Sequence, residues 1–314
     1  MKAVVLNRIT RAEEIELTEV ETPKVKSGWV LIRVRAFGMN HSEQILRLEE
    51  FVEEYIQKPV IPGIECVGEI VDASDSNFKI GQKVIAMMGG MGRSFDGSYA
   101  EFALLPIHHV FAVESNLDWA HLAAIPETYF TAWGSLFECL QLKLSDSILI
   151  RGATCALGFA AIQIAKSLGC RVLATTHRTK KLPLLEEADE KILDEGKLEG
   201  KIHVDKILDL IGARDLRDTM RLLNPGGICC STGILGGVET LNNFDPITFI
   251  PNGAYLTGFY SNYPTQKIVD EIFQFIRDKN LEPPIGKIFD FENIREACIA
   301  QDNHSITGKI VVKI

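Results

Sequence analysis

Residues 150–161 form the segment of this chain best suited to specific chemistry. The segment follows a predicted strand and opens a predicted helix at 157–168. A turn in that context brings backbone N–H groups close to the pyrophosphate of a dinucleotide, at the positive end of a helix. The pattern G-x-G-x-x-G falls on Ala153, Cys155 and Gly158, so only its last glycine is present. Taken alone, the match leaves open a generic strand–turn–helix packed with small residues.

The next predicted strand sharpens this interpretation. An NAD site usually carries Asp or Glu about 20 residues after the glycine turn, where it binds the adenosine ribose. Here residues 175–181 read Thr-Thr-His-Arg-Thr-Lys-Lys, and the first acid after them is Glu186. Cations at this place would receive a 2′-phosphate, which favours NADPH over NADH. The alternative is a solvated basic loop, and spacing does not say which of Arg178, Lys180 and Lys181 points inward.

The sequence pattern changes along the chain, and the two patterns indicate which elements position these residues. The first third holds short β-rich runs at 30–35, 67–71, 83–87 and 99–103, with Gly28, Gly63, Gly81 and Gly97 as turn residues. Such spacing predicts a compact barrel or sandwich. Beyond residue 124, strands at 147–152, 171–175, 206–210 and 228–232 alternate with helical segments. That alternation predicts a parallel, doubly wound sheet.

The last fifty residues complete the expected organisation. A turn at 224–227 precedes the strand at 228–232, and an amphipathic helix is predicted at 266–279. Residues 308–314 resemble a closing strand that returns to the first domain. We therefore expect one domain at 1–124 with 265–314, and a second at 125–264.

Composition narrows the class of protein. The 314 residues suggest about two domains. With 33 Lys and Arg against 42 Asp and Glu, the net charge of −9 disfavours nucleic acid and acidic membrane surfaces as partners. Seven cysteines without a Cys-x-x-Cys pair favour a reducing compartment. The N-terminus shows no signal core, and prolines and glycines interrupt the uncharged stretch 246–266, so a cytoplasmic protein is expected.

Ordered motifs along the whole chain resemble the medium-chain dehydrogenase/reductase superfamily, in its zinc-independent quinone oxidoreductase (zeta-crystallin-like) branch. These motifs stand at 37–43, 61–68, 81–84, 97–102, 131–133, 152–158, 209–212, 223–227 and 308–311. The resemblance implies an α/β fold with a GroES-like β-barrel catalytic domain and a Rossmann-type nucleotide-binding domain. It also implies a homodimer joined through residues 255–260, since an apolar edge strand is an aggregation hazard unless paired.

The same resemblance bears on metal binding. Where similar zinc alcohol dehydrogenases carry catalytic ligands, this chain has Asn40, Ile64 and, by a looser alignment, Glu127. The four-cysteine lobe expected after residue 84 has no cysteine. His41 and Glu65 remain, but one histidine and one carboxylate do not make a tetrahedral zinc site. We therefore expect no metal, and hydride transfer to a quinone or a conjugated carbonyl rather than alcohol oxidation.

The resemblance also assigns roles to single residues. Asn40 matches an active-site asparagine, with a turn residue as the alternative, and Thr131 matches a threonine beneath the nicotinamide, with a helix N-cap as the alternative. His41 is a candidate proton relay, and Cys155 a candidate low-pKa thiol or a small filler. The residues expected to bind the cofactor are Thr131, Gly152, Thr154, Cys155, Ala156, Leu157, Gly158, Thr175, Thr176, His177, Arg178, Lys181, Leu210, Ile211, Ser231, Thr232, Gly233, Ile234, Gly258 and Phe259.

The function expected from these residues is NADPH-dependent, metal-free reduction of a quinone or an α,β-unsaturated carbonyl. Ile45 and Leu46 stand where some relatives have a pocket tyrosine, so no side-chain proton donor is evident and solvent is the expected proton source. Two alternatives stay open: an enoyl-thioester reductase, and a non-catalytic NADPH-binding redox sensor.

Overall fold

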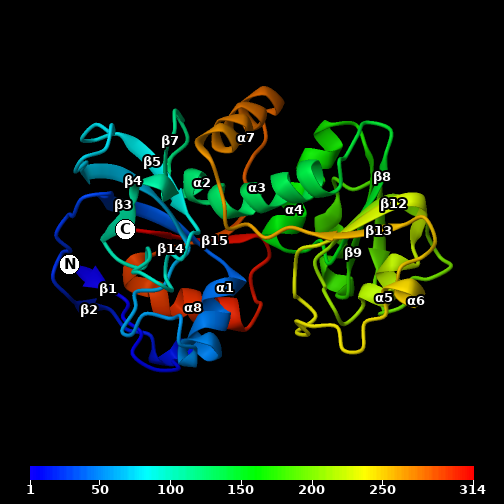
Figure 1. Ribbon diagram of the computed structural model, residues 1–314, viewed down its shortest axis with the longest axis horizontal. Coiled ribbons are helices and arrows are strands. Elements are labelled where there is room, and N and C mark those ends of the chain that lie inside the picture. The colour runs from blue at the N-terminus through cyan, green and yellow to red at the C-terminus, as the bar shows by residue number, and fades with distance from the viewer. The chain divides into compact units, whose positions relative to one another are not determined.

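The computed structural model describes residues 1–314, which form two compact units (Figure 1). Unit 1 comprises Met1–Phe130 and Asn262–Ile314, and unit 2 comprises Thr131–Ser261. Every strand pairs only with strands of its own unit. None of the helices combines the length and the apolar character that a bilayer span requires.

Unit 2 is built on a six-stranded parallel sheet in the order β10-β9-β8-β11-β12-β13. This confirms the predicted doubly wound arrangement. Its strands are β8 (Ser147–Arg151), β9 (Arg171–Thr176), β10 (Glu190–Leu193), β11 (Val204–Asp209), β12 (Leu223–Ser231) and β13 (Tyr255–Gly258). Its helical segments are η4 (Gly134–Cys139), α4 (Ala156–Ser167), η5 (Thr179–Leu185), α5 (Leu216–Met220) and α6 (Pro246–Phe249).

One local prediction in unit 2 was wrong. The turn expected at 224–227 lies inside β12, which already begins at Leu223. Val204 pairs with Leu223 and Lys206 with Ile228, so the register shifts across the glycines between these pairs. The Pro-Gly-Gly stretch therefore forms an irregularity within a strand pair that continues on both sides of it.

Unit 1 holds a seven-stranded sheet around the larger apolar core. The order is β14-β15-β3-β4-β5-β7, with β6 paired to β3. These strands are β3 (Trp29–Met39), β4 (Glu65–Asp72), β5 (Lys83–Met87), β6 (Phe102–Pro106), β7 (Val110–Ala112), β14 (Ile285–Asp290) and β15 (Lys309–Lys313). A separate pair is formed by β1 (Lys2–Ala3) and β2 (Thr18–Glu19).

The helical segments of unit 1 connect and cover these strands. They are η1 (Ala12–Glu14), α1 (His41–Leu48), η2 (Glu50–Val52), η3 (Ile107–His109), α2 (Trp119–Ala123), α3 (Pro126–Trp133, whose last residues reach into unit 2), α7 (Gln266–Lys279), η6 (Phe291–Asn293) and α8 (Ile294–Asp302). The predicted helix at 266–279 is confirmed as α7, which buries Val269, Ile272, Phe273 and Ile276.

The predicted closing strand is confirmed as β15, which joins unit 1. It pairs antiparallel with β3, with Ile310 opposite Met39, and parallel with β14. Figure 1 shows this red strand among the elements of unit 1. The strand predicted at 99–103 instead begins at Phe102. Residues just before it bond to the N-terminal segment, because Val4 N–H donates to the carbonyl of Tyr99 at 2.9 Å.

Candidate cofactor and catalytic site

The turn after β8 is held by the strand beside it. Gly152 has φ +83°, a conformation that favours glycine, and its N–H donates to Thr175 Oγ1 at 3.0 Å. Ala153 N–H donates to the Thr175 carbonyl at 2.8 Å, and the hydroxyls of Thr154 and Thr176 lie 3.1 Å apart. The structure thus brings the first residues of the predicted cofactor turn together with the end of β9.

Gly158 is the glycine that this turn requires. A Cβ at this position would lie 2.2 Å from the carbonyl oxygen of Ala153, so no larger residue fits without moving backbone. The first turn of α4, which includes Ala156 and Leu157, therefore packs directly on the segment that precedes it. The missing glycines at 153 and 155 leave this close approach intact.

Cys155 serves as the N-cap of α4. Its Sγ accepts the N–H of Gly158 at 3.4 Å. Burial raises the pKa of the Cys155 thiol, and the backbone N–H groups of Gly158 and Leu157 offset only part of that effect. The suggestion of a lowered pKa is therefore wrong, and the small-filler interpretation agrees with the structure.

Cations gather after β9. Arg178 Nε donates to His177 Nε2 at 3.1 Å, and Lys181 is half-buried while Lys180 is exposed. Burial lowers the pKa of His177, and so do the charges of Arg178, Lys181 and Arg214. Sequence reasoning missed Arg214, because it lies in the segment between β11 and α5, far along the chain from the glycine turn.

The predicted residues that follow β11 and β12 meet at the carboxyl edge of the sheet. Thr232 N–H donates to the Asp209 carbonyl at 3.0 Å, and a Cβ at Gly233 would lie 2.5 Å from the carbonyl oxygen of Leu210. Ile211 follows Leu210, and Ser231, Gly233 and Ile234 flank Thr232. The structure therefore brings these two segments together, at the end of the sheet where ligands bind in doubly wound folds.

Thr131, Gly258 and Phe259 lie elsewhere in the sequence. Thr131 is a buried residue in the last turn of α3, so the proposal of a helix N-cap at this position is wrong. Gly258 ends β13, and the ring of Phe259 covers Gly134, where a Cβ would lie 2.0 Å from a ring carbon.

In unit 1, Asn40 stands between β3 and α1. Its N–H donates to Glu43 Oε2 at 2.7 Å, which caps the start of the helix as the turn-residue alternative implies. Its half-buried side chain does something further. Nδ2 donates to Glu65 Oε1 at 2.8 Å, and Oδ1 accepts from Lys309 Nζ at 2.6 Å. Asn40 therefore contacts both members of a buried ion pair.

Lys309 and Glu65 form that pair, with Nζ 2.5 Å from Oε1 and both residues 1% exposed. The second carboxylate oxygen of Glu65 accepts the N–H of Glu127 at 2.8 Å. The lysine chain passes so close to Gly38 that a Cβ there would lie 2.3 Å from its Cε. Sequence reasoning missed Lys309. The Gly308-Lys309 pair of the motif at 308–311 could have indicated this lysine, but the motif was interpreted only as part of a closing strand.

The positions that match zinc ligands meet around Glu65, because Asn40 and the backbone of Glu127 both bond to it. No three His, Cys, Asp or Glu side chains gather where they could hold a metal ion. His41 is exposed, with Nδ1 2.7 Å from Gln44 Oε1. The ammonium of Lys309 already binds the Glu65 carboxylate, and the matching positions supply an amide and an isoleucine, so these donors do not fit a zinc ion.

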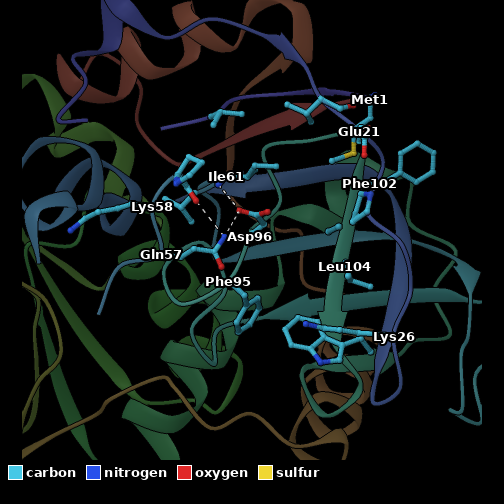
Figure 2. A pocket seen from close by; sticks show the side chains of 17 residues that line it. Met1, Glu21, Lys26, Gln57, Lys58, Ile61, Phe95, Asp96, Phe102 and Leu104 are labelled. Atoms are coloured by element: carbon cyan, nitrogen blue, oxygen red, sulfur yellow. Dashed lines mark hydrogen bonds between the residues drawn. The ribbon is translucent and has the colours of Figure 1, made fainter. Parts of the chain in front are cut away.

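A separate cavity of about 450 Å³ opens in unit 1 (Figure 2). Trp29, Phe95 and Phe102 supply much of its apolar lining. Its Asp96 carboxylate accepts the N–H of Ile61 at 2.9 Å and the amide of Gln57 at 3.2 Å, as Figure 2 shows. None of the predicted site residues lines this cavity.

Comparison with known proteins places the chain. Residues 26–115 match the alcohol dehydrogenase GroES-like domain, and residues 187–312 match a family described as zinc-binding dehydrogenase. A quinone oxidoreductase of Rattus norvegicus is 31% identical over 255 residues, which cover 76% of this chain and 75% of that protein. The chain belongs to the medium-chain dehydrogenase/reductase superfamily, in its quinone oxidoreductase branch.

Solved structures show the same fold. A quinone oxidoreductase from Coxiella burnetii aligns with a TM-score of 0.86 at 22% identity, over 100% of this chain and 99% of that one. The yhdH oxidoreductase from Salmonella enterica, solved in complex with NADP, aligns with a TM-score of 0.85 at 20% identity over the whole of both chains. The protein is an oxidoreductase of a family that uses a nicotinamide cofactor.

Proposed function

We propose that this protein is a zinc-independent reductase that transfers a hydride from NADPH to a quinone or an α,β-unsaturated carbonyl. The observation that carries the proposal is the group of cations around His177, just after β9. Arg178 and Lys181 belong to the same segment, Arg214 follows β11, and the charges of all three lower the pKa of His177. No carboxylate stands in residues 175–181 to bind a free ribose hydroxyl.

The chain's own residues would hold the cofactor at three places. Backbone N–H groups of residues 152–158 would bind the pyrophosphate, as helix N-termini do. Arg178 and Lys181 would bind the 2′-phosphate through charge-assisted hydrogen bonds. Thr131 and the segments 231–234 and 258–259 would contact the nicotinamide and its ribose, and residues 210–211 would face the adenosine side. When bound, NADPH supplies the hydride.

The acceptor follows from the charges around Glu65. Lys309 neutralises this carboxylate, and no three His, Cys, Asp or Glu side chains gather to hold the metal ion that would activate an alcohol. Quinones and conjugated carbonyls need less activation, because the negative charge they gain is delocalised onto oxygen. Asn40 would donate a hydrogen bond to that oxygen, and water would supply the proton.

We also propose a cytoplasmic homodimer joined through β13. This strand ends the unit 2 sheet on one side. Its first residue, Tyr255, is 61% exposed, and Tyr260, just past its end, is 73% exposed. All seven cysteines are free thiols, which suits a reducing compartment. Light scattering should give twice the 34.9 kDa chain mass, and Tyr255→Asp, at an exposed position of β13, should give the single mass. A monomeric wild type would contradict the dimer.

The test of function is the initial rate of NADPH oxidation by metal-stripped protein, offered 9,10-phenanthrenequinone and a 2-alkenal in turn. Arg178→Ala with Lys181→Ala should raise KM for NADPH about 10- to 100-fold. The two side chains would bind the same phosphate, so we expect their joint removal to cost about as much as one charged hydrogen bond, about 1.5–3 kcal/mol. KM for NADH should change little.

Lys180→Ala is the matched control, because Lys180 belongs to the same segment but, unlike Arg178 and Lys181, is not among the charges that lower the pKa of His177. Its KM for NADPH should stay within about threefold of the wild-type value. A wild type that prefers NADH would contradict the cofactor assignment. Tight NADPH binding without turnover of either acceptor would favour the thioester reductase or the redox sensor instead.

A further inference from the structure

So far the buried ammonium of Lys309 has been given one role, the neutralisation of Glu65. We propose that Lys309 and Glu65 are positioning residues that hold the Asn40 amide in one orientation, so that one Nδ2–H is the only group Asn40 offers to the hydride acceptor. This inference rests on the proposed reductase function and deepens it, because it states which atom of Asn40 acts.

The orientation follows from what each partner can do. An ammonium group only donates hydrogen bonds, so the Asn40 atom 2.6 Å from Lys309 Nζ must be the carbonyl oxygen. An ionised carboxylate only accepts, so the atom 2.8 Å from Glu65 Oε1 must be the amide nitrogen. In the reversed orientation the amide nitrogen would face the Lys309 ammonium, donor against donor, and the amide oxygen would face the Glu65 carboxylate, acceptor against acceptor. Two independent contacts therefore require the same orientation.

The surrounding backbone leaves this pair little room to move. Glu65 Oε2 is bound by the N–H of Glu127, which fixes how the carboxylate lies. The close passage of Lys309 beside Gly38 fixes the lysine chain. The carbonyl of Asn40 accepts from Gln301 Nε2 at 2.8 Å, so the asparagine backbone is held as well. The cluster is thus anchored from β3, β4, β15 and α8.

The consequence for Asn40 is a fixed chemical role. Its carbonyl oxygen is bound by Lys309, and one hydrogen of Nδ2 is bound by Glu65. An amide nitrogen carries a second hydrogen, and Asn40 is only half-buried. That second N–H can donate to the acceptor oxygen as it gains negative charge. Asn40 therefore acts as a donor and not as an acceptor.

The decisive variant is Lys309→Met with Glu65→Gln, which removes both buried charges at similar volume. In the double variant the N–H of Glu127 requires the oxygen of the new glutamine amide, which leaves that amide's nitrogen facing Asn40. Asn40 must then present its carbonyl oxygen there, so its amide is reversed while the hydrogen bonds remain complementary. Replacing a buried ion pair by neutral groups of similar size is often tolerated.

We expect kcat with 9,10-phenanthrenequinone to fall about 100- to 1,000-fold in the double variant, the loss typical of one donor to a developing oxyanion. KM for NADPH and the urea midpoint should stay near the wild-type values. Lys313→Met, an exposed lysine of the same strand, is the control and should keep wild-type kcat. A double variant with wild-type kcat, or one that changes only KM for NADPH, would overturn the inference.

Asn40→Asp tests the same donor without touching the ion pair. At neutral pH this variant should lose both kcat and stability, because the introduced carboxylate faces that of Glu65 and the single ammonium of Lys309 would have to neutralise both. At lower pH a proton shared between these two carboxylates should restore the urea midpoint but not kcat, since no second hydrogen is left for the acceptor. Recovery of kcat together with stability would show a merely structural role. A wild type inactive with both acceptors would instead refute the proposed function itself.

Discussion

Each unit of this protein buries one long cation at the end of a strand, and the two are satisfied differently. Arg151 ends β8, and its guanidinium binds Asp194 at 2.8 and 3.2 Å, Asp218 at 2.7 Å and Thr219 at 2.9 Å. Lys309 begins β15 and binds one carboxylate and one amide oxygen. Both cations are essentially inaccessible to solvent.

The difference lies in what each cation leaves for a ligand. Arg151 has a structural role, because its hydrogen bonds to Asp194, Asp218 and Thr219 connect β8 to the end of β10 and to α5. Lys309 instead polarises an asparagine that is half-buried and keeps one N–H. A planar fork with several donors suits the first task, and a compact point charge suits the second. Burial of a cation therefore does not by itself indicate a catalytic role; its hydrogen-bond partners decide whether it is structural or functional.

Removing the guanidinium should have the largest effect on stability. Arg151→Met leaves Asp194 and Asp218 without their cation, and we expect a loss of about 3–5 kcal/mol in the free energy of unfolding. Urea denaturation followed by circular dichroism measures it. Arg171→Met, which breaks an exposed pair with Glu190, should cost less than about 1 kcal/mol. Equal losses would contradict the contrast between buried and exposed pairs.

Crowding the lysine should affect activity more than stability. A Cβ at Gly38 would lie 2.3 Å from Lys309 Cε and 2.6 Å from Glu65 Oε1, so Gly38→Ala must displace the pair that holds Asn40. We expect about 1–3 kcal/mol of destabilisation and a fall in kcat of about tenfold or more. Kinetics beside urea melts separate the two. Unchanged kcat in a destabilised variant would place the cluster with Arg151 as purely structural.

Each cation also has a buried carboxyl group nearby, Asp209 or Glu43, whose pKa is raised mainly by desolvation. A raised folded-state pKa means that the folded protein binds the proton more tightly than the unfolded chain. Stability from such a group is full below the unfolded pKa of about 4 and is lost as pH rises through the folded value. Asp209→Asn and Glu43→Gln should each flatten that part of the urea-stability profile.

The two substitutions should differ in their cost at pH 7. Asp209 Oδ1 accepts two backbone N–H groups and Oδ2 meets a hydroxyl, so an amide nitrogen is tolerated there. Both oxygens of Glu43 accept backbone N–H groups, so in Glu43→Gln the new amide nitrogen faces a backbone donor whichever way the amide lies. We expect under about 1 kcal/mol for the first and about 1–3 kcal/mol for the second. The reverse order would contradict these assignments.

The smallest effect concerns the thiol in the phosphate turn. Because burial raises the pKa of Cys155, its thiolate is scarcer at pH 8 than that of an ordinary cysteine. Alkylation of Cys155 by iodoacetamide, followed by peptide mass spectrometry, should be slower than that of free glutathione and should rise with pH. NADPH should slow it further. Faster labelling than glutathione would revive the low-pKa interpretation.

The fold of unit 2 was largely predictable because it depends on local patterns. Buried runs such as 147–152 and the helix after them are visible in short windows, and parallel strands follow from their alternation. The exceptions have local causes too: residues 224–227 have turn composition but lie in an irregular strand pair. Thr131 has N-cap chemistry, yet the helix already begins at Pro126.

The candidate site was less predictable because its contacts are distant in sequence. Asn40 could be singled out by its motif, but its partners Glu65 and Lys309 lie in two other strands. Arg214 escaped for the same reason. The spacing of residues within one motif does not show which side chains of another strand lie beside that motif. The register in which the strands pair determines those neighbours, and it is known only from the structure.

The pairing of β15 with β3 has a consequence for how the protein is made. Lys309 and Asn40 are 269 residues apart, and all of unit 2 lies between them in the chain. During synthesis, unit 2 can therefore finish folding while the sheet of unit 1 still lacks the strand that carries its buried cation. Until that strand arrives, Glu65 has no counter-ion and Asn40 has no fixed orientation. A nascent or truncated chain can thus present a folded nucleotide-binding unit without the arrangement that we propose for catalysis.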